Sequence, residues 1–88
     1  MKPEISWPWE KSRSYGELAY KLYISVFYDS DMCVCVFPEK NEFVIHDLVD
    51  GGMKRMQFPD GYLKLEEKKA YVELMLRLGV WDELLEDI

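Results

Sequence analysis

The stretch Tyr20–Leu48, YKLYISVFYDSDMCVCVFPEKNEFVIHDL, decides the fold, because its apolar residues form three strand-like runs separated by turn signals. Leu22–Tyr28 is rich in β-branched and aromatic residues, and the Asp-Ser-Asp sequence at 29–31 supplies turn chemistry after it. Met32–Phe37 and Glu42–Leu48 follow as the second and third runs. We therefore predict a three-stranded antiparallel meander.

The register of this meander follows from its second loop. Residues 38–41, Pro-Glu-Lys-Asn, suit a four-residue hairpin connection built on a type I turn. Antiparallel partners keep a constant index sum, so Phe37 pairs with Glu42, Val36 with Phe43, Val34 with Ile45 and Cys33 with His46. One face, the aliphatic face, then collects Leu22, Ile24, Val26, Tyr28, Met32, Val34, Val36, Phe43 and Ile45. The other, the mixed face, collects Tyr23, Ser25, Phe27, Cys33, Cys35, Phe37, Val44 and His46.

The strongest helical pattern runs from about Glu66 to Leu78, with acidic residues in its first turn and Gly79 as a suitable end. We expect this helix to cover the aliphatic face. Its predicted apolar side consists of Ala70, Tyr71, Leu74, Met75 and Leu78. Its predicted charged stripe consists of Lys69, Glu73 and Arg77.

The remaining segments give weaker signals. Residues 1–13 lack clear periodicity and are predicted to form an irregular arm that carries Trp7 and Trp9. Residues 14–17 fit either a helix-starting capping box or the approach to a strand, and we favour a strand from about Leu18. Met53–Phe58 forms either a fourth strand or an extended link. The prediction is one α+β domain over 1–88, with an arm (1–13), a three- to four-stranded meander (18–58) and a helical region (65–88).

Composition limits the function classes. The 88 residues carry a net charge of −6 and are 49% hydrophobic and 15% aromatic, which is typical of a folded domain. Negative charge repels phosphate backbones, so direct nucleic-acid binding is not expected and a basic protein partner is favoured. Neither an apolar leader nor a long uncharged run is visible, so we expect a soluble cytoplasmic chain without membrane contact.

The group that comes nearest to chemistry is Cys33, Cys35 and His46 on the mixed face. Three such ligands hold zinc only with a fourth, and the turn-borne cysteine pairs of structural zinc sites are absent. The spacing of the two cysteines along a strand disfavours a disulfide between them. We therefore interpret the cysteines as small hydrophobes and predict no catalytic residue, metal or cofactor. A small Cys/His-dependent enzyme or metal site remains the third hypothesis.

Protein binding is the leading hypothesis. The single helix covers one sheet face, so the mixed face needs the Trp7 and Trp9 arm, a second copy of the chain or a partner, and of these we favour burial by the arm. A second candidate surface is the acidic C-terminus. The predicted partner-binding residues are Trp7, Trp9, Tyr23, Phe27, Phe37, Asp82, Glu83, Glu86 and Asp87.

The sequence thus indicates a small acidic inhibitor or adaptor of the phage or mobile-element type. It would block a basic site on a nucleic-acid-handling or defence protein, an anti-defence role. The alternative is a homodimer whose mixed faces pack together through Tyr23, Phe27, Phe37 and Val44.

Overall fold

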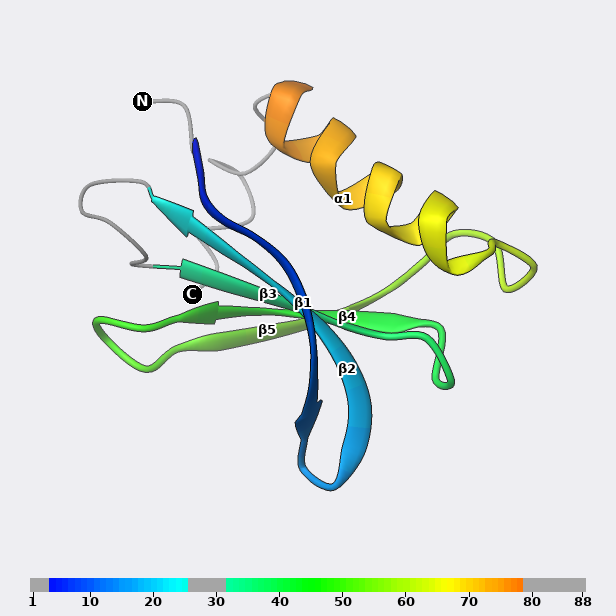
Figure 1. Ribbon diagram of the computed structural model, residues 1–88, viewed down its shortest axis with the longest axis horizontal. Coiled ribbons are helices and arrows are strands. Elements are labelled where there is room, and N and C mark those ends of the chain that lie inside the picture. Colours follow the sequence, from blue (N-terminus) through cyan, green and yellow to red (C-terminus); the bar gives the residue numbers. More distant parts are fainter. Residues whose placement is uncertain (1–3, 26–31, 79–88) are drawn as a thin grey trace.

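The computed structural model describes residues 4–25 and 32–78 and folds them into one antiparallel sheet with a helix on one face (Figure 1). The α+β class is confirmed, but the sheet has five strands within these residues rather than three or four. They lie in chain order across the sheet: β1 (Glu4–Ser14), β2 (Glu17–Ser25), β3 (Met32–Phe37), β4 (Glu42–Asp47) and β5 (Met53–Gln57), followed by helix α1 (Leu65–Leu78).

The predicted hairpin of β3 and β4 is confirmed in its register, and β3 has the predicted bounds. Phe37 pairs with Glu42, Val36 with Phe43, Val34 with Ile45 and Cys33 with His46. The loop closes by a hydrogen bond of 3.2 Å from the Lys40 N–H to the Phe37 carbonyl, as in a type I turn with proline at its second position. The strand predicted to reach Leu48 ends one residue earlier, at Asp47.

The N-terminal arm is the main error in the predicted fold, because residues 4–14 form edge strand β1 and pair with β2. Two register shifts interrupt this pairing, one between Ile5 and Trp7 and one between Trp7 and Glu10. Each shift places extra residues on β1, and Pro8 lies in the second of them. Bulges and a proline are typical of edge strands, and they erase the alternation by which a strand is recognised in a sequence.

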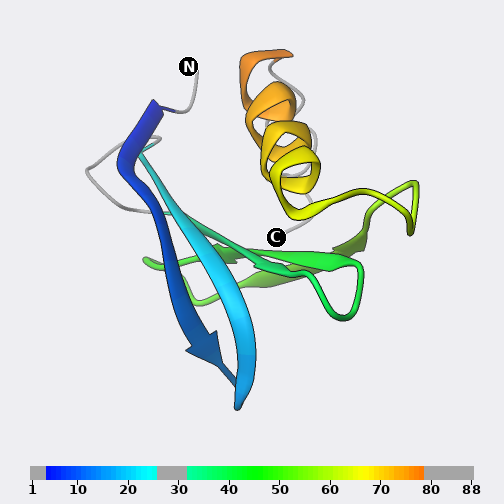
Figure 2. The same cartoon turned by 45° about the vertical axis from the view of Figure 1, so that its right-hand side comes forward.

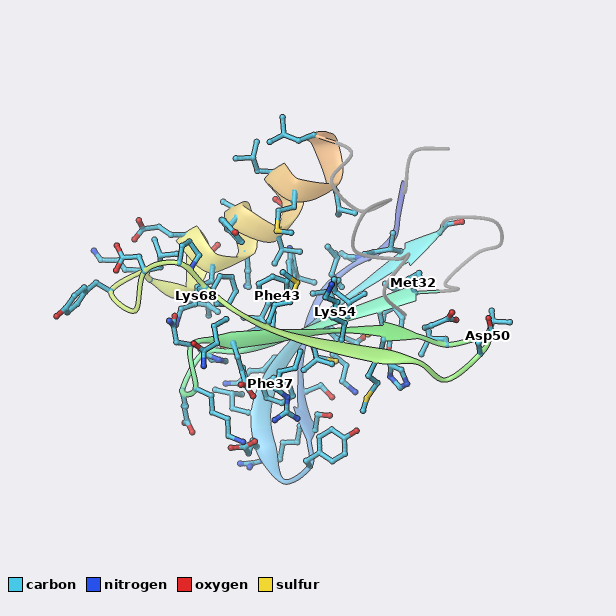
Figure 3. All side chains as sticks on the ribbon, turned by 180° about the vertical axis from the view of Figure 1, so that it is seen from behind. Met32, Phe37, Phe43, Asp50, Lys54 and Lys68 are labelled. Carbon is cyan, nitrogen blue, oxygen red and sulfur yellow. The ribbon has the colours of Figure 1, made fainter. Side chains whose placement is uncertain are left out.

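The aliphatic face packs under α1, as predicted (Figure 2). Phe43 lies between the sheet and the helix (Figure 3), with its ring centroid 4.8 Å from that of Phe58 and 6.2 Å from that of Tyr71. The buried residues of this core are Leu22, Ile24, Met32, Val34, Val36, Phe43, Ile45, Phe58, Val72 and Leu76. The predicted contributions of Val26 and Tyr28 lie outside the described residues.

The buried side of α1 agrees with the prediction for Tyr71 and Met75 and differs from it elsewhere. Val72 and Leu76 are buried, with Tyr71 and Met75 packed beside them, whereas Ala70, Leu74 and Leu78 are exposed. The row continues to Lys68, whose apolar stem is buried while its Nζ donates to the Pro38 carbonyl at 3.0 Å. The buried row of α1 therefore includes a charged residue. A pattern that counts only apolar residues misses this row and predicts a different side of the helix toward the sheet.

Trp9 lies on the helix side of the sheet and not over the mixed face, which corrects the predicted position of the arm. Its indole Nε1 donates to the Glu73 carboxylate at 3.0 Å, and Lys69 Nζ lies 6.0 Å from its ring centroid. The same ammonium lies 4.6 Å from the ring centroid of Tyr20. Glu73 and Lys69, two residues of the predicted charged stripe, therefore fasten the helix to the first two strands.

Candidate binding cavity

The mixed face is hollow, because the sheet curls over it. The β1–β2 hairpin extends to the side of the sheet opposite α1 (Figure 2). Its tip reaches the first residue of β5, where the Tyr15 hydroxyl lies 3.7 Å from the Met53 sulfur. A cavity of about 250 Å³ lies on this face between the hairpin tip and the start of β5.

The floor of the cavity is a second, smaller apolar core. Cys33, Cys35, Phe37 and Val44 line it and are all buried, and the half-buried Tyr23 packs against them. Phe37 lies on the side of the sheet opposite Phe43 (Figure 3). The cavity thus confirms the predicted mixed face for Tyr23, Cys33, Cys35, Phe37, Val44 and His46, but the Trp9 side chain takes no part in covering it.

The sheet register sets polar and sulfur-bearing side chains in rows across this cavity. Cys33 pairs with His46, and His46 pairs with Met53, so these three residues form one row across β3, β4 and β5. In the neighbouring row Lys21 pairs with Cys35. All five side chains line the cavity.

The two thiols interact directly. Both cysteines are free, and their Sγ atoms lie 3.9 Å apart. The pKa of Cys35 is lowered, because its sulfur shares a hydrogen bond with Cys33 and the positive charge of Lys21 is near. The same hydrogen bond, together with burial, raises the pKa of Cys33. Cys35 is therefore the thiol that ionises first.

This difference predicts an order of alkylation on the folded chain. At pH 8 and limiting iodoacetamide we expect Cys35 to be modified before Cys33, because the thiolate is the reacting species and a lower pKa increases its fraction. Tandem mass spectrometry of the peptide that contains both residues locates the label. In urea the two should react at similar rates, and a folded chain labelled first at Cys33 would contradict the assignment.

The rim of the cavity is the exposed part of this site, and we define it as Tyr15, Leu48, Val49 and Met53. All four are large, apolar and exposed, and all except Val49 line the cavity. Leu48 and Val49 lie in the turn between β4 and β5, which is held by the Asp47 carboxylate. Its Oδ1 accepts hydrogen bonds from the N–H groups of Val49 at 2.9 Å and Asp50 at 3.0 Å.

Tyr15 is held at the rim by a two-residue turn. The φ angles of Tyr15 and Gly16 are 54° and 80°, the signs expected for a type I′ hairpin turn. Ser14 pairs with Glu17 on either side of it. The capping box considered for residues 14–17 is therefore a hairpin turn, and the interpretation as the approach to a strand is correct.

The structure places only some of the site residues predicted from the sequence at the cavity. Tyr23 and Phe37 line the cavity, whereas Trp9 lies on the other face of the sheet. Phe27, Asp82, Glu83, Glu86, Asp87 and the side chain of Trp7 lie outside the described residues. Sequence reasoning missed the rim, and the signal that could have located it is the large aromatic residue placed directly before Gly16 in a turn.

Asp50 and Asp60, the acidic residues of the turns before and after β5, do not lie on one patch of the surface. Asp50 lies before β5 and Asp60 after it, and the Phe58 N–H donates to the Asn41 carbonyl at 3.0 Å. This bond places the segment after β5 beside the β3–β4 loop, at the end of the strand away from Asp50. Among residues 4–25 and 32–78, Asp47 and Asp50 are the acidic residues that flank Leu48 and Val49 of the rim.

Few side chains of the described residues are placed for metal binding. Across residues 4–25 and 32–78, no three His, Cys, Asp or Glu side chains come together as a metal site. This excludes a zinc site with four such ligands from this part of the chain. In the same residues no helix is long and apolar enough to cross a membrane.

In comparisons with protein-family models, with curated proteins and with solved structures, nothing matches the chain.

Proposed function

We propose that the chain is a non-enzymatic protein-binding module and that Tyr15 is its principal anchor. This side chain is 75% exposed and adopts a φ of 54°. That backbone conformation is unfavourable for tyrosine, whereas asparagine tolerates it well. The strain is located in an exposed residue at the mouth of a cavity, and strained residues concentrate at functional positions. This observation carries the proposal.

The residues around Tyr15 support a docking surface. The rim brings its four apolar side chains together on three separate segments of the chain: the β1–β2 turn, the β4–β5 turn and the start of β5. Tyrosine and methionine are enriched in protein interfaces, where they bury large areas at the centre of the contact. A partner side chain that covers the rim would close the cavity.

Charge indicates what kind of partner fits. The chain carries a net charge of −6, and Asp47 and Asp50 lie beside Val49 in the rim turn. Negative potential steers association with a positively charged surface. We therefore infer a larger protein with a basic surface, such as a nucleic-acid-handling or defence protein. On such a partner the module acts as a stoichiometric inhibitor or adaptor of the phage type, assisted by Asp82, Glu83, Glu86 and Asp87.

The homodimer finds less support. It required Phe37 and Val44 as exposed contact residues, and both are buried within the chain. A mass measurement at micromolar concentration separates a monomeric module from a dimer.

The substitution Tyr15→Asn separates binding from folding. Asn-Gly is the preferred pair for this turn, so we expect the free energy of unfolding to stay unchanged or to rise by up to about 1 kcal/mol. We expect partner affinity to fall about thirtyfold or more, because anchor residues contribute about 2 kcal/mol or more. Thermal unfolding measures the first effect. Capture of host-lysate proteins on the immobilised chain, at low and at high salt, measures the second.

The matched control is Tyr62→Asn. Tyr62 is 95% exposed and lies in the segment between β5 and α1, away from the rim. A protein retained by the wild type and by the Tyr62 variant, but lost from the Tyr15 variant and released by salt, supports the proposal. Proteins retained equally by all three chains would overturn it.

A further inference from the structure

The cavity floor carries two thiols that the proposed binding role does not use. Cys33 and Cys35 are 4% and 7% exposed, both line the cavity, and both are free. They project from the same face of β3, because alternate residues of a strand share a face. A pair of adjacent reduced thiols on the wall of a cavity is a ready ligand set for a soft metal ion.

The spacing of the sulfur atoms suits a shared metal ion better than a bond between them. Sulfurs 3.9 Å apart subtend about 116° at an ion that lies about 2.3 Å from each, the usual thiolate–zinc distance. This angle is between the tetrahedral and the trigonal values, so the pair can hold an ion without backbone movement. A disulfide would require the sulfurs to approach to about 2.05 Å.

The surroundings select the class of ion. Zinc in a structural site takes four ligands, and no third His, Cys, Asp or Glu joins the thiols within the described residues. Thiolate and thioether ligands favour Cu(I), and the Met53 thioether lines the same cavity. Two thiolates with one Cu(I) carry a net charge of −1, which the nearby ammonium of Lys21 offsets.

We propose that Cys33 and Cys35 bind one Cu(I) ion at the floor of the cavity. Binding forms two sulfur–copper bonds and releases the two thiol protons to solvent, without a change in oxidation state. His46 and Met53 lie in the same row as Cys33 and line the same cavity. This site does not depend on the proposed protein partner, since Cys33 and Cys35 are buried in the floor of the cavity, below the rim.

Anaerobic titration of the full chain with Cu(I), against a chromophoric Cu(I) chelator, tests the proposal. We expect one Cu(I) per chain, with thiolate-to-copper absorption in the near ultraviolet. Cys33→Ser and Cys35→Ser should each weaken binding by at least about a hundredfold, since even the loss of outer-shell partners costs up to that much. Tyr23→Phe, which alters the same cavity without removing a soft ligand, should bind as the wild type does.

Protection from alkylation provides a measurement that needs no variant. One equivalent of Cu(I) should slow the modification of both cysteines in the folded wild type, whereas one equivalent of Zn(II) should not. Circular dichroism verifies that each serine variant is folded. Copper binding that survives both serine substitutions, or zinc protection equal to that by copper, would overturn the proposal.

Discussion

Replacing Val72 with aspartate is expected to unfold the protein, whereas the same change two residues later at Leu74 is expected to leave it folded. Val72 is 0% exposed between α1 and the sheet, and Leu74 is 50% exposed on the outer side of the helix. A carboxylate buried without a partner costs more than about 4 kcal/mol, a large part of the stability of a small domain. The exposed substitution should cost less than about 1 kcal/mol.

Urea unfolding followed by circular dichroism measures both variants under the same conditions. Both substitutions replace an aliphatic residue of the same helix with aspartate, two positions apart. The difference between their unfolding free energies therefore reports which side of α1 faces the sheet. Equal destabilisation by the two substitutions, or a larger effect at Leu74, would contradict the observed rotation of the helix. It would restore Ala70, Leu74 and Leu78 to the buried side of the helix, where the sequence pattern placed them together with Tyr71 and Met75.

Phe43→Ala is expected to cost about 3–5 kcal/mol, the usual range for removing a buried phenylalanine. Phe43 is fully buried at the centre of the larger core, where its ring meets those of Phe58 and Tyr71. Its removal leaves a cavity between the sheet and α1 and separates the aromatic cluster that holds the helix.

Two further variants serve as controls for Phe43→Ala. Phe43→Leu keeps most of the buried volume and should lose less than half as much stability as the alanine variant. Tyr62→Ala removes an aromatic ring that is almost fully exposed and should change the free energy of unfolding by less than about 0.5 kcal/mol. A midpoint for Phe43→Ala close to that of the wild type would show that this core does not determine the stability.

The central hairpin was predictable because its physics is local. Pro38 sets the turn, the alternation of β3 and β4 is regular, and a single index sum then orders both faces. The sorting of residues into the core under α1 and the floor of the cavity followed from that register alone. Nothing distant in the chain changed it.

The errors arose where tertiary contacts overrule local pattern. Pro8 and two bulges hide β1, and only its pairing with β2 reveals the strand. Lys68 is charged in the sequence but buried in the fold, because its ammonium finds the Pro38 carbonyl thirty residues away. The cavity depends on how far the sheet curls, and alternation of residues carries no information about curvature.

The irregularity of β1 has a consequence for how the chain behaves in a crowded solution. An open sheet has two edges whose unpaired backbone groups invite other chains to add strands and to begin aggregation. At one edge, Pro8 and the two bulges leave no straight ladder to extend. At the other, Lys54 and Arg55 place positive charge along the five residues of β5. Both edges of the sheet that residues 4–25 and 32–78 form are thereby poor templates for polymer growth.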